Sequence, residues 1–198
     1  TIQNQFLDKT QFVLCGFDLR GQVSEINKQT GEIRKRDILP HETVWSQYEK
    51  IFTNDYKSLS PEYSKFLLTF KDEKYSDENE PYRRRWTQEI SRYANNYNYF
   101  DVSLAPLVES MFNGCKSQLK IIEAGFHKKP IIASETSPYT IDLINAVDEG
   151  KFIDKGNALL VSPRKNHKQW AQHIKRLIEK PNMIEDLGNR LYEKVKDK

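Results

Sequence analysis

Three charged residues with helical spacing are the strongest chemical feature of the sequence. Lys116, Lys120 and Glu123 are separated by four and then three positions, and at about 100° per residue a helix places them along one stripe. Lysines neutralise phosphate charge, and one carboxylate can accept hydrogen bonds from two neighbouring hydroxyls. The stripe therefore suits a nucleoside diphosphate, which carries phosphates at one end and a vicinal diol at the other. The simpler alternative is a surface ion pair between Lys120 and Glu123.

The start of this helix is predicted to bind an anion. Ser117 is a favourable N-cap residue. The backbone amides of Gln118 and Leu119 would then point out of the helix, where they and the helix dipole favour negative charge. Glu123 would lie about 9 Å further along the axis, at about 1.5 Å per residue. A diphosphate at the tip and a diol at the carboxylate would match this separation.

The neighbouring segments predict how this helix is held. Residues 101–107 form a short apolar run typical of a buried strand, and a second apolar run at 131–133 follows the helix. Leu119, Ile122 and Phe126 make an apolar stripe that we expect to face the sheet. The order strand, helix, strand is a βαβ unit, in which ligands bind at the carboxyl ends of the strands.

A further strand and a hairpin are predicted near the N-terminus. Residues 12–18 predict a strand followed by a turn at Gly16, and a glycine there would let the backbone approach a nucleotide closely. Residues 20–36 alternate polar and apolar types around a turn at 29–31, which predicts a surface hairpin. The basic cluster at 34–36 is typical of a solvated face, with contact to a ligand or membrane as the alternative.

The middle of the chain predicts two helices and a strand. Residues 44–52 have the spacing of a short amphipathic helix, and residues 66–70 read as a strand. A helix of about 15 residues is predicted from Pro81, with Arg83–Arg85 at its start. Cations are unfavourable at that end of a helix. We therefore expect these arginines to pair with the acidic loop at 71–80, or else to contact the phosphates of a ligand.

Helices and one strand are predicted toward the C-terminus. Ser137 and Pro138 have the residue types of a helix start, and a helix is expected to follow them. Residues 158–161 predict the last strand. Two further helices are expected, one ending at Glu179 and one over residues 183–196, separated by a proline.

The composition limits the class of protein. With 198 residues, of which 37% are hydrophobic and 30% charged, the chain suits one domain with a well-solvated surface. The formal net charge of +3 does not by itself indicate a nucleic-acid partner. Cys15 and Cys115 provide no disulfide framework, and no run approaches the roughly 18 apolar residues of a membrane span. We therefore expect a reduced, cytoplasmic setting.

Other reaction chemistries lack their motifs. The sequence contains no dinucleotide-binding Gly-x-Gly-x-x-Gly, no Walker Gly-Lys-Ser/Thr and no Gly-x-Ser-x-Gly elbow. No metal or cofactor is expected, because the histidines are not spaced as ligands, and no residue stands out as a nucleophile. The four histidines are His41, His127, His167 and His173.

Three segments together resemble a known family. The order Asp101–Leu107, Phe112–Ser134 and Gly156–Pro163 is similar to the donor-binding half of GT-B glycosyltransferases of the group-1 (family 4) retaining class. That class usually carries two glutamates separated by seven residues. Glu123 matches the second, whereas Cys115 stands at the first. The chain thus resembles a subgroup with the pattern Lys-Ser-x-x-Lys-x-x-Glu, and no catalytic residue can be assigned.

The resemblance implies a fold and a domain organisation. The expected class is α/β, with a Rossmann-like, mostly parallel sheet flanked by helices, forming one half of a GT-B fold. Residues 1–198 would form one nucleotide-sugar-binding domain, with a hairpin inserted at 20–36. We expect the sequence to be cut at its N-terminus and to lack the acceptor-binding domain, so that this chain alone is inactive.

The resemblance also implies an activity and residue roles. A sugar would pass from a nucleotide-diphosphate donor to an acceptor such as a glycan or lipid-linked glycan, with retention at the anomeric carbon. Glu123 would bind the ribose diol, while Ser117 and the amides of Gln118 and Leu119 would bind the diphosphate. Lys116 and Lys120 would neutralise charge on the leaving diphosphate.

Two alternatives remain open. One is a sugar-nucleotide epimerase of the same fold, and the other is a non-catalytic domain that binds RNA or another anion through the clusters at Arg34 and Arg83. The transferase interpretation expects a nucleotide-sugar donor and the acceptor domain as partners, with no nucleic acid. It allows peripheral contact with the inner face of a membrane. The base, the sugar and the acceptor are not specified by the sequence.

Overall fold

The computed structural model describes most of the chain in two compact units. It describes all residues except 1–5, 7–8, 18–21, 40–41, 43–81 and 164–165. The helix predicted at 44–52, the strand at 66–70 and the acidic loop at 71–80 lie outside the described residues. One unit spans Gln11–Tyr93, and the other combines Ala94–Lys198 with the first ten residues.

The first predicted strand is confirmed, but the turn predicted at Gly16 is wrong. β1 (Phe12–Phe17) pairs in parallel with β4 (Tyr82–Trp86). Gly16 lies inside β1, where the register shifts between Cys15 and Phe17. Its φ of 89° is a conformation that residues with a Cβ rarely adopt. The glycine therefore permits a bulge within the strand rather than a turn after it.

The long helix predicted from Pro81 is wrong. Residues Tyr82–Trp86 form β4, and only the short helix α4 (Ile90–Tyr93) follows within this unit. Arg83–Arg85 thus lie in a strand, where a helix dipole cannot act on them. Backbone pairing with β1, which is far away in the sequence, overrides the local helical pattern because it satisfies the peptide groups of this segment.

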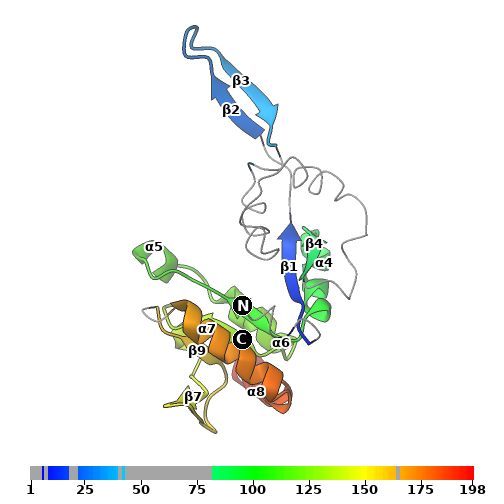
Figure 1. Ribbon diagram of the computed structural model, residues 1–198, viewed down its shortest axis with the longest axis vertical. Coiled ribbons are helices and arrows are strands. Elements are labelled where there is room, and N and C mark those ends of the chain that lie inside the picture. Colours follow the sequence, from blue (N-terminus) through cyan, green and yellow to red (C-terminus); the bar gives the residue numbers. More distant parts are fainter. Residues whose placement is uncertain (1–5, 7–8, 18–21, 40–41, 43–81, 164–165) are drawn as a thin grey trace. The chain divides into compact units, whose positions relative to one another are not determined.

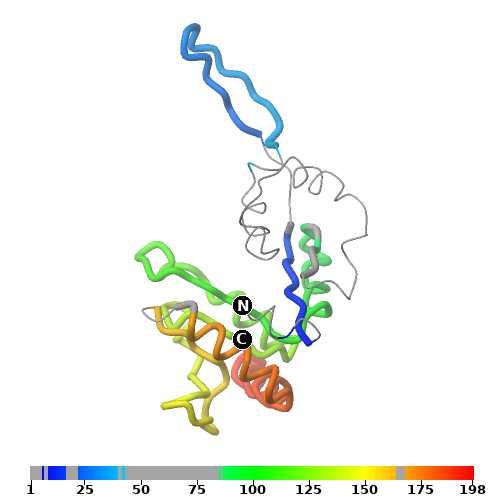
Figure 2. The backbone as a smooth tube through the Cα atoms, viewed as in Figure 1, coloured from blue at the N-terminus to red at the C-terminus, as the bar shows by residue number. Residues whose placement is uncertain are grey.

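The hairpin predicted at 20–36 is present. β2 (Gln22–Ile26) pairs antiparallel with β3 (Ile33–Asp37), and Figure 2 shows the two strands side by side. The side chain of Asn27 accepts hydrogen bonds from the amides two and three residues ahead, at 2.9 and 3.3 Å. Local capping of this kind is how asparagine favours tight turns.

The unit Ala94–Lys198 contains a three-stranded parallel sheet flanked by helices. The sheet has the order β5 (Ser103–Ala105), β6 (Ile131–Ser134), β9 (Leu159–Val161). The predicted βαβ unit, last strand and two C-terminal helices are therefore confirmed, and the mixed α/β arrangement is compatible with a Rossmann-like fold. The other elements (Figure 1) are η4 (Ala94–Tyr99), α5 (Met111–Gly114), α6 (Leu119–Phe126), η5 (Tyr139–Ile141), β7 (Val147–Asp148), β8 (Lys151–Phe152), α7 (Asn166–Glu179) and α8 (Asn182–Val195).

Successive residues of the central strand enter two apolar layers. Ile131 and Ala133 of β6 pack in one layer with residues of α6 and with Leu191 and Val195 of α8. Ile132 packs in the other layer with residues of β9 and α7. This alternation is the period of two expected of a strand covered on both faces. The sheet thereby fixes α6 by its buried side.

The buried face of α6 differs from the predicted one. Leu119 and Phe126 are 55% and 48% exposed, so the stripe that they were expected to form does not face the sheet. The difference follows from α8, since a Cβ on Gly125 would lie 2.3 Å from Cγ2 of Val195. The glycine lets the two helices approach closely, so the side of α6 that carries Gly125 is the buried one. The residues buried instead are Ile121, Ala124 and Gly125.

The helix predicted after Pro138 is also wrong. Only the 3-10 helix η5 forms there. The buried side chain of Asn157 accepts a hydrogen bond from the amide of Ile144 (2.8 Å) and donates one to the carbonyl of Asp142 (3.0 Å). These contacts satisfy the backbone of the segment beside β9, so it does not need helical hydrogen bonds.

The imidazole of His173 in α7 is buried, and only one of its two ring nitrogens forms a described hydrogen bond. Its Nε2 donates to the carbonyl of Leu160 at 2.9 Å, and its Nδ1 is buried without a hydrogen-bond partner among the described residues. Burial lowers the pKa of His173 below its ordinary value, and the nearby charge of Arg176 acts in the same direction, although the bond to Leu160 opposes them. The folded protein therefore favours the neutral imidazole more than the unfolded chain does.

Acidification is expected to destabilise the fold through His173. Because the pKa is lower in the folded state, stability is complete above the unfolded pKa of about 6.5 and decreases as pH falls below it. The loss is at most about 1.4 kcal/mol per pH unit. A His173→Gln variant can still donate to Leu160, so its unfolding free energy should decrease less between pH 7 and pH 5. Urea titrations at both pH values test this, and equal slopes for the two proteins would contradict it.

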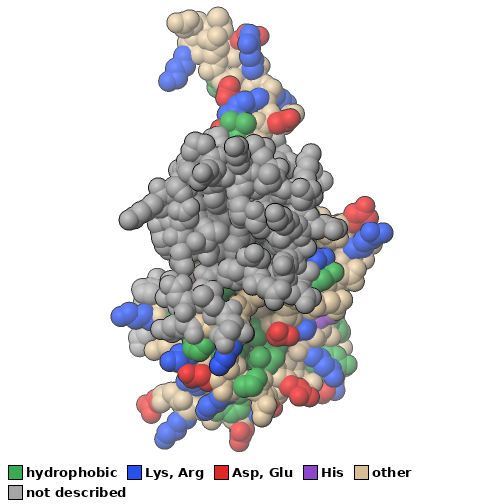
Figure 3. Space-filling view, turned by 45° about the vertical axis from the view of Figure 1, so that its right-hand side comes forward, with side chains coloured by type: hydrophobic (Ala, Val, Ile, Leu, Met, Phe, Trp, Pro, Cys, Tyr) green, Lys and Arg blue, Asp and Glu red, His purple; other side chains and the backbone are tan. Residues whose placement is uncertain are grey.

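The described surface carries mixed charge. Lys and Arg side chains are interspersed with Asp and Glu side chains over the described part of the face in Figure 3, as expected from the small net charge. Every described helix is too short or too polar to traverse a bilayer.

Candidate functional site

The helix that carries the predicted site begins one residue later than expected. Gln118, rather than Ser117, occupies the N-cap position of α6, and its side chain makes no capping hydrogen bond. The shift has a local cause. The amide of Cys115 donates to Phe112 and that of Lys116 donates to Asn113, so the turn of α5 continues almost to Ser117. The predicted capping role of Ser117 is therefore wrong.

The tip of α6 still offers unpaired donors. No described residue accepts a hydrogen bond from the amides of Gln118, Leu119 or Lys120. The amides of Ile121 and Ile122 both donate to the carbonyl of Gln118, at 2.9 and 3.2 Å. Unpaired donors at a helix start, together with the helix dipole, favour an anion. The predicted donors at 118 and 119 thus remain available, and Lys120 adds a third.

Lys116 and Lys120 add positive charge beside this tip. Both side chains are exposed, and neither forms an ion pair with a described carboxylate. The ammonium of Lys116 lies 5.2 Å from the ring centroid of Phe112, a distance typical of a cation–π contact. The surface pair between Lys120 and Glu123, which was the simpler interpretation of the spacing, is absent from the described contacts.

Glu123 is instead held by an aromatic residue. The hydroxyl of Tyr97 donates to Oε2 of Glu123 at 3.0 Å, and Glu123 is half-buried. Tyr97 belongs to η4, twenty-six positions earlier in the sequence, and is 5% exposed. Glu123 lies about 7.5 Å along the axis from the N-cap, at about 1.5 Å per residue. The unpaired amides and Glu123 therefore lie on the same helix, within about one and a half turns of each other.

The loop before α6 is ordered by its own side chains. Oγ of Ser110 accepts a hydrogen bond from the amide of Asn113 at 3.2 Å, and Nδ2 of Asn113 donates to the carbonyl of Val108 at 2.7 Å. Leu107 is tied to β6, because its amide donates to Oγ of Ser134 at 2.8 Å. The segment between β5 and α6 therefore runs from a fixed point at the carboxyl end of the sheet.

Gly16, the remaining predicted site residue, belongs to the unit Gln11–Tyr93. Its Cβ position is open, with Oγ1 of Thr87 at 4.0 Å as the nearest atom. The positive φ and the strand bulge account for a glycine there without any ligand. The expected close approach of the Gly16 backbone to a nucleotide stays a prediction, and it does not depend on the contacts of α6.

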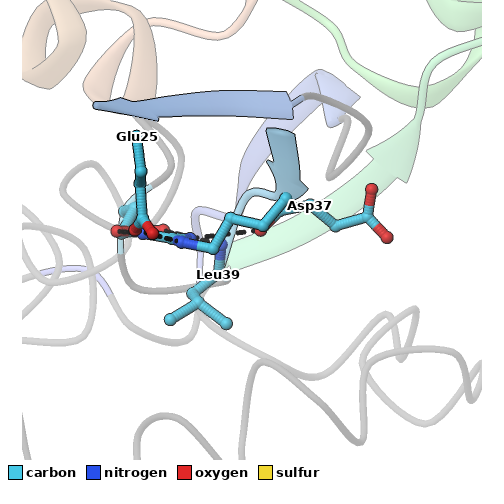
Figure 4. A network of polar contacts seen from close by, with 5 residues as sticks. Glu25, Asp37 and Leu39 are labelled. Carbon is cyan, nitrogen blue, oxygen red and sulfur yellow. Dashed lines mark hydrogen bonds and ion pairs between the residues drawn. The ribbon is translucent and has the colours of Figure 1, made fainter. Parts of the chain in front are cut away.

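The basic cluster of the hairpin is largely neutralised by nearby acids. Nε of Arg36 lies 2.6 Å from Oε1 of Glu25, and its two terminal nitrogens each lie 2.7 Å from an oxygen of Glu42. Figure 4 shows this network, in which the amide of Leu39 also donates to Glu42. These carboxylates raise the pKa of Arg36 above its ordinary value. Arg34 pairs with Glu32 at 3.3 Å. Such pairing leaves less charge for RNA or another anion.

Sequence reasoning missed Tyr97 and the Ser110–Asn113 turn. The ring of Tyr97 is 5% exposed, and its hydroxyl donates to Glu123. A buried tyrosine usually finds a hydrogen-bond partner for its hydroxyl, which is the signal in the sequence that points to such a contact. The spacing of Ser110 and Asn113 is typical of a side-chain cap.

Neither similarity to known proteins nor a group of metal-binding side chains assigns a function to the described site. No protein-family model, no curated protein and no solved structure matches the chain. Within the described residues, no three or more His, Cys, Asp or Glu side chains are grouped as metal ligands. The site is therefore defined by the contacts of α6 and of the segments that hold it.

Proposed function

We propose that this chain is the donor-binding part of a glycosyltransferase of the GT-B class. It would bind a nucleotide-diphosphate sugar and support transfer of the sugar to an acceptor such as a glycan. The observation that carries the proposal is the tip of α6. Three amides and two lysines there lack a described anionic partner, and a carboxylate oriented by Tyr97 follows on the same helix.

Each group has a defined part in the proposed reaction. The amides at 118–120 bind the diphosphate, and Glu123 accepts hydrogen bonds from the ribose hydroxyls. Lys116 and Lys120 stabilise the negative charge that grows on the diphosphate as the bond to the sugar breaks. This is electrostatic stabilisation of a transition state and requires no nucleophile from α6.

Loss of the carboxylate is expected to weaken nucleotide binding strongly. Calorimetric titration of the chain with UDP and with GDP should give one-to-one binding to at least one of them. Glu123→Ala should weaken that binding by about tenfold or more, because a hydrogen bond to a charged group contributes about 1.5–3 kcal/mol. Glu185→Ala is the matched control, since Glu185 is an exposed residue of α8. The affinity of this variant for the nucleotide should equal that of the wild type.

Two results would speak against the proposal. One is binding of neither UDP nor GDP, and the other is unchanged affinity in Glu123→Ala. Salt dependence separates a nucleic-acid binder from a nucleotide site. Affinity for RNA falls by orders of magnitude between about 50 and 200 mM salt when several phosphates are contacted, whereas a single diphosphate should show a much weaker dependence.

A further inference from the structure

The hydroxyl of Tyr97 occupies one oxygen of the carboxylate proposed to bind ribose. The two atoms are 3.0 Å apart, and they connect η4 to α6 across the unit Ala94–Lys198. A tyrosine hydroxyl that donates to a carboxylate forms a charge-assisted hydrogen bond, which is stronger than one between neutral groups. The bond therefore restricts the side-chain torsions of Glu123.

The ring of Tyr97 is itself fixed by two neighbours. The imidazole of His127 stacks on it with a centroid distance of 4.7 Å and an interplanar angle of 4°. Phe100 contacts it in a tilted arrangement, at 5.2 Å and 57°. The ring is 5% exposed, and these contacts keep its hydroxyl beside the carboxylate of Glu123. Stacked and tilted aromatic pairs at these distances are favourable.

Glu123 is consequently oriented but not saturated. A carboxylate offers about four lone-pair positions, and the bond from Tyr97 uses one of them. No described residue donates a hydrogen bond to Oε1 of Glu123. An oriented acceptor with open positions can bind two adjacent hydroxyls without first losing side-chain entropy.

We propose that Tyr97 is a positioning residue that aligns Glu123 for the vicinal diol of a ribonucleotide and so makes the site select ribose over 2′-deoxyribose. This inference rests on the proposed function. The aligned oxygens receive hydrogen bonds from the 2′- and 3′-hydroxyls, whereas a 2′-deoxyribose leaves one position of the aligned carboxylate without a donor. A purely structural tie between η4 and α6 would give no such selectivity.

The test compares ribonucleotides with 2′-deoxyribonucleotides in a conservative variant. Affinities for UDP, 2′-deoxy-UDP, GDP and 2′-deoxy-GDP are measured by calorimetry for the wild type, Tyr97→Phe and Tyr192→Phe. The last is the control, because Tyr192 is a half-buried tyrosine of α8 whose ring lies beneath the ammonium of Lys128. Thermal midpoints of the same samples report whether the variants are folded.

The wild type and the control should bind the ribonucleotide about tenfold more tightly than the 2′-deoxy form. Tyr97→Phe should weaken ribonucleotide binding by about five- to tenfold and change 2′-deoxyribonucleotide binding by less than about twofold. Selectivity that persists in Tyr97→Phe, or equal weakening of both forms, would overturn the positioning role while leaving the nucleotide site intact. Equal binding of both forms by the wild type would overturn it as well. Absence of any nucleotide binding would instead reject the proposed function itself.

Discussion

Replacing Gly188 by alanine is expected to lower the free energy of unfolding of the unit Ala94–Lys198 by about 3 kcal/mol. A Cβ at this position of α8 would lie 2.1 Å from the carbonyl oxygen of Lys128 and 2.9 Å from its carbonyl carbon. Both atoms belong to the backbone of the turn between α6 and β6, which cannot move like the end of a flexible side chain. The helix or the turn must therefore shift.

Two effects compete at Gly188, and the contact should dominate. Alanine is favoured over glycine in a helix by about 1 kcal/mol, so a glycine inside α8 is retained against its helix propensity. Thermal unfolding monitored by circular dichroism should show a midpoint lower by about 5 °C or more.

Gly114→Ala is the control for the glycine substitution, because a Cβ at Gly114 would meet no atom within 4 Å. It should leave the midpoint unchanged or raise it slightly. A Gly188→Ala protein as stable as the control would show that α8 does not pack against the turn as the structure has it.

Asn157→Ala is expected to cost about 2–4 kcal/mol of stability. The substitution removes the acceptor for the amide of Ile144 and the donor for the carbonyl of Asp142. Asn157 is 5% exposed, so water cannot readily replace its amide. The amide of Ile144 and the carbonyl of Asp142 would lose these partners. An unsatisfied backbone group that water cannot reach costs about 1–3 kcal/mol.

Urea denaturation measures the effect, with Asn189→Ala as the comparison. Asn189 is an exposed residue of α8, and its replacement should change the unfolding free energy by less than about 0.5 kcal/mol. Similar losses in the two variants would mean that Asn157 does not hold the segment before β9.

The elements predicted correctly are those whose signals are local. β6 follows Pro130 as an apolar run, and all four of its residues are buried. α7 and α8 show apolar residues at helical spacing and are separated by a proline. Such patterns depend on residues within a few positions of one another, so the sequence alone carries them.

The errors arise where a distant partner decides the local structure. Residues 82–86 form a strand because they pair with β1, about seventy positions earlier. The buried side of α6 is the one that carries Gly125, where α8 packs closely although it lies about sixty positions later in the sequence. The segment after Pro138 stays non-helical because Asn157 satisfies its backbone. None of these contacts is visible in a short window of sequence.

The sequence predicts part of the geometry around α6, and the binding of a nucleotide there stays a prediction. The spacing of Lys120 and Glu123 correctly predicts a helix that carries both residues. Lys116, predicted on the same helix, lies before its N-cap, so the stripe of three charged residues is wrong at that position. The cap at Ser117 failed because the preceding turn extends toward it. Tyr97 could not be paired with Glu123 beforehand, since the contact depends on how η4 meets α6.

The most direct test of the central claim locates the nucleotide on the chain. A titration of the isotopically labelled protein with UDP and with GDP, followed by amide NMR, reports which backbone groups meet the ligand. We expect at least one nucleotide to shift the amide signals of Gln118, Leu119 and Lys120 most strongly, with saturation at one equivalent. Shifts centred on Arg34–Arg36, or no shifts at the start of α6 with either nucleotide, would contradict it.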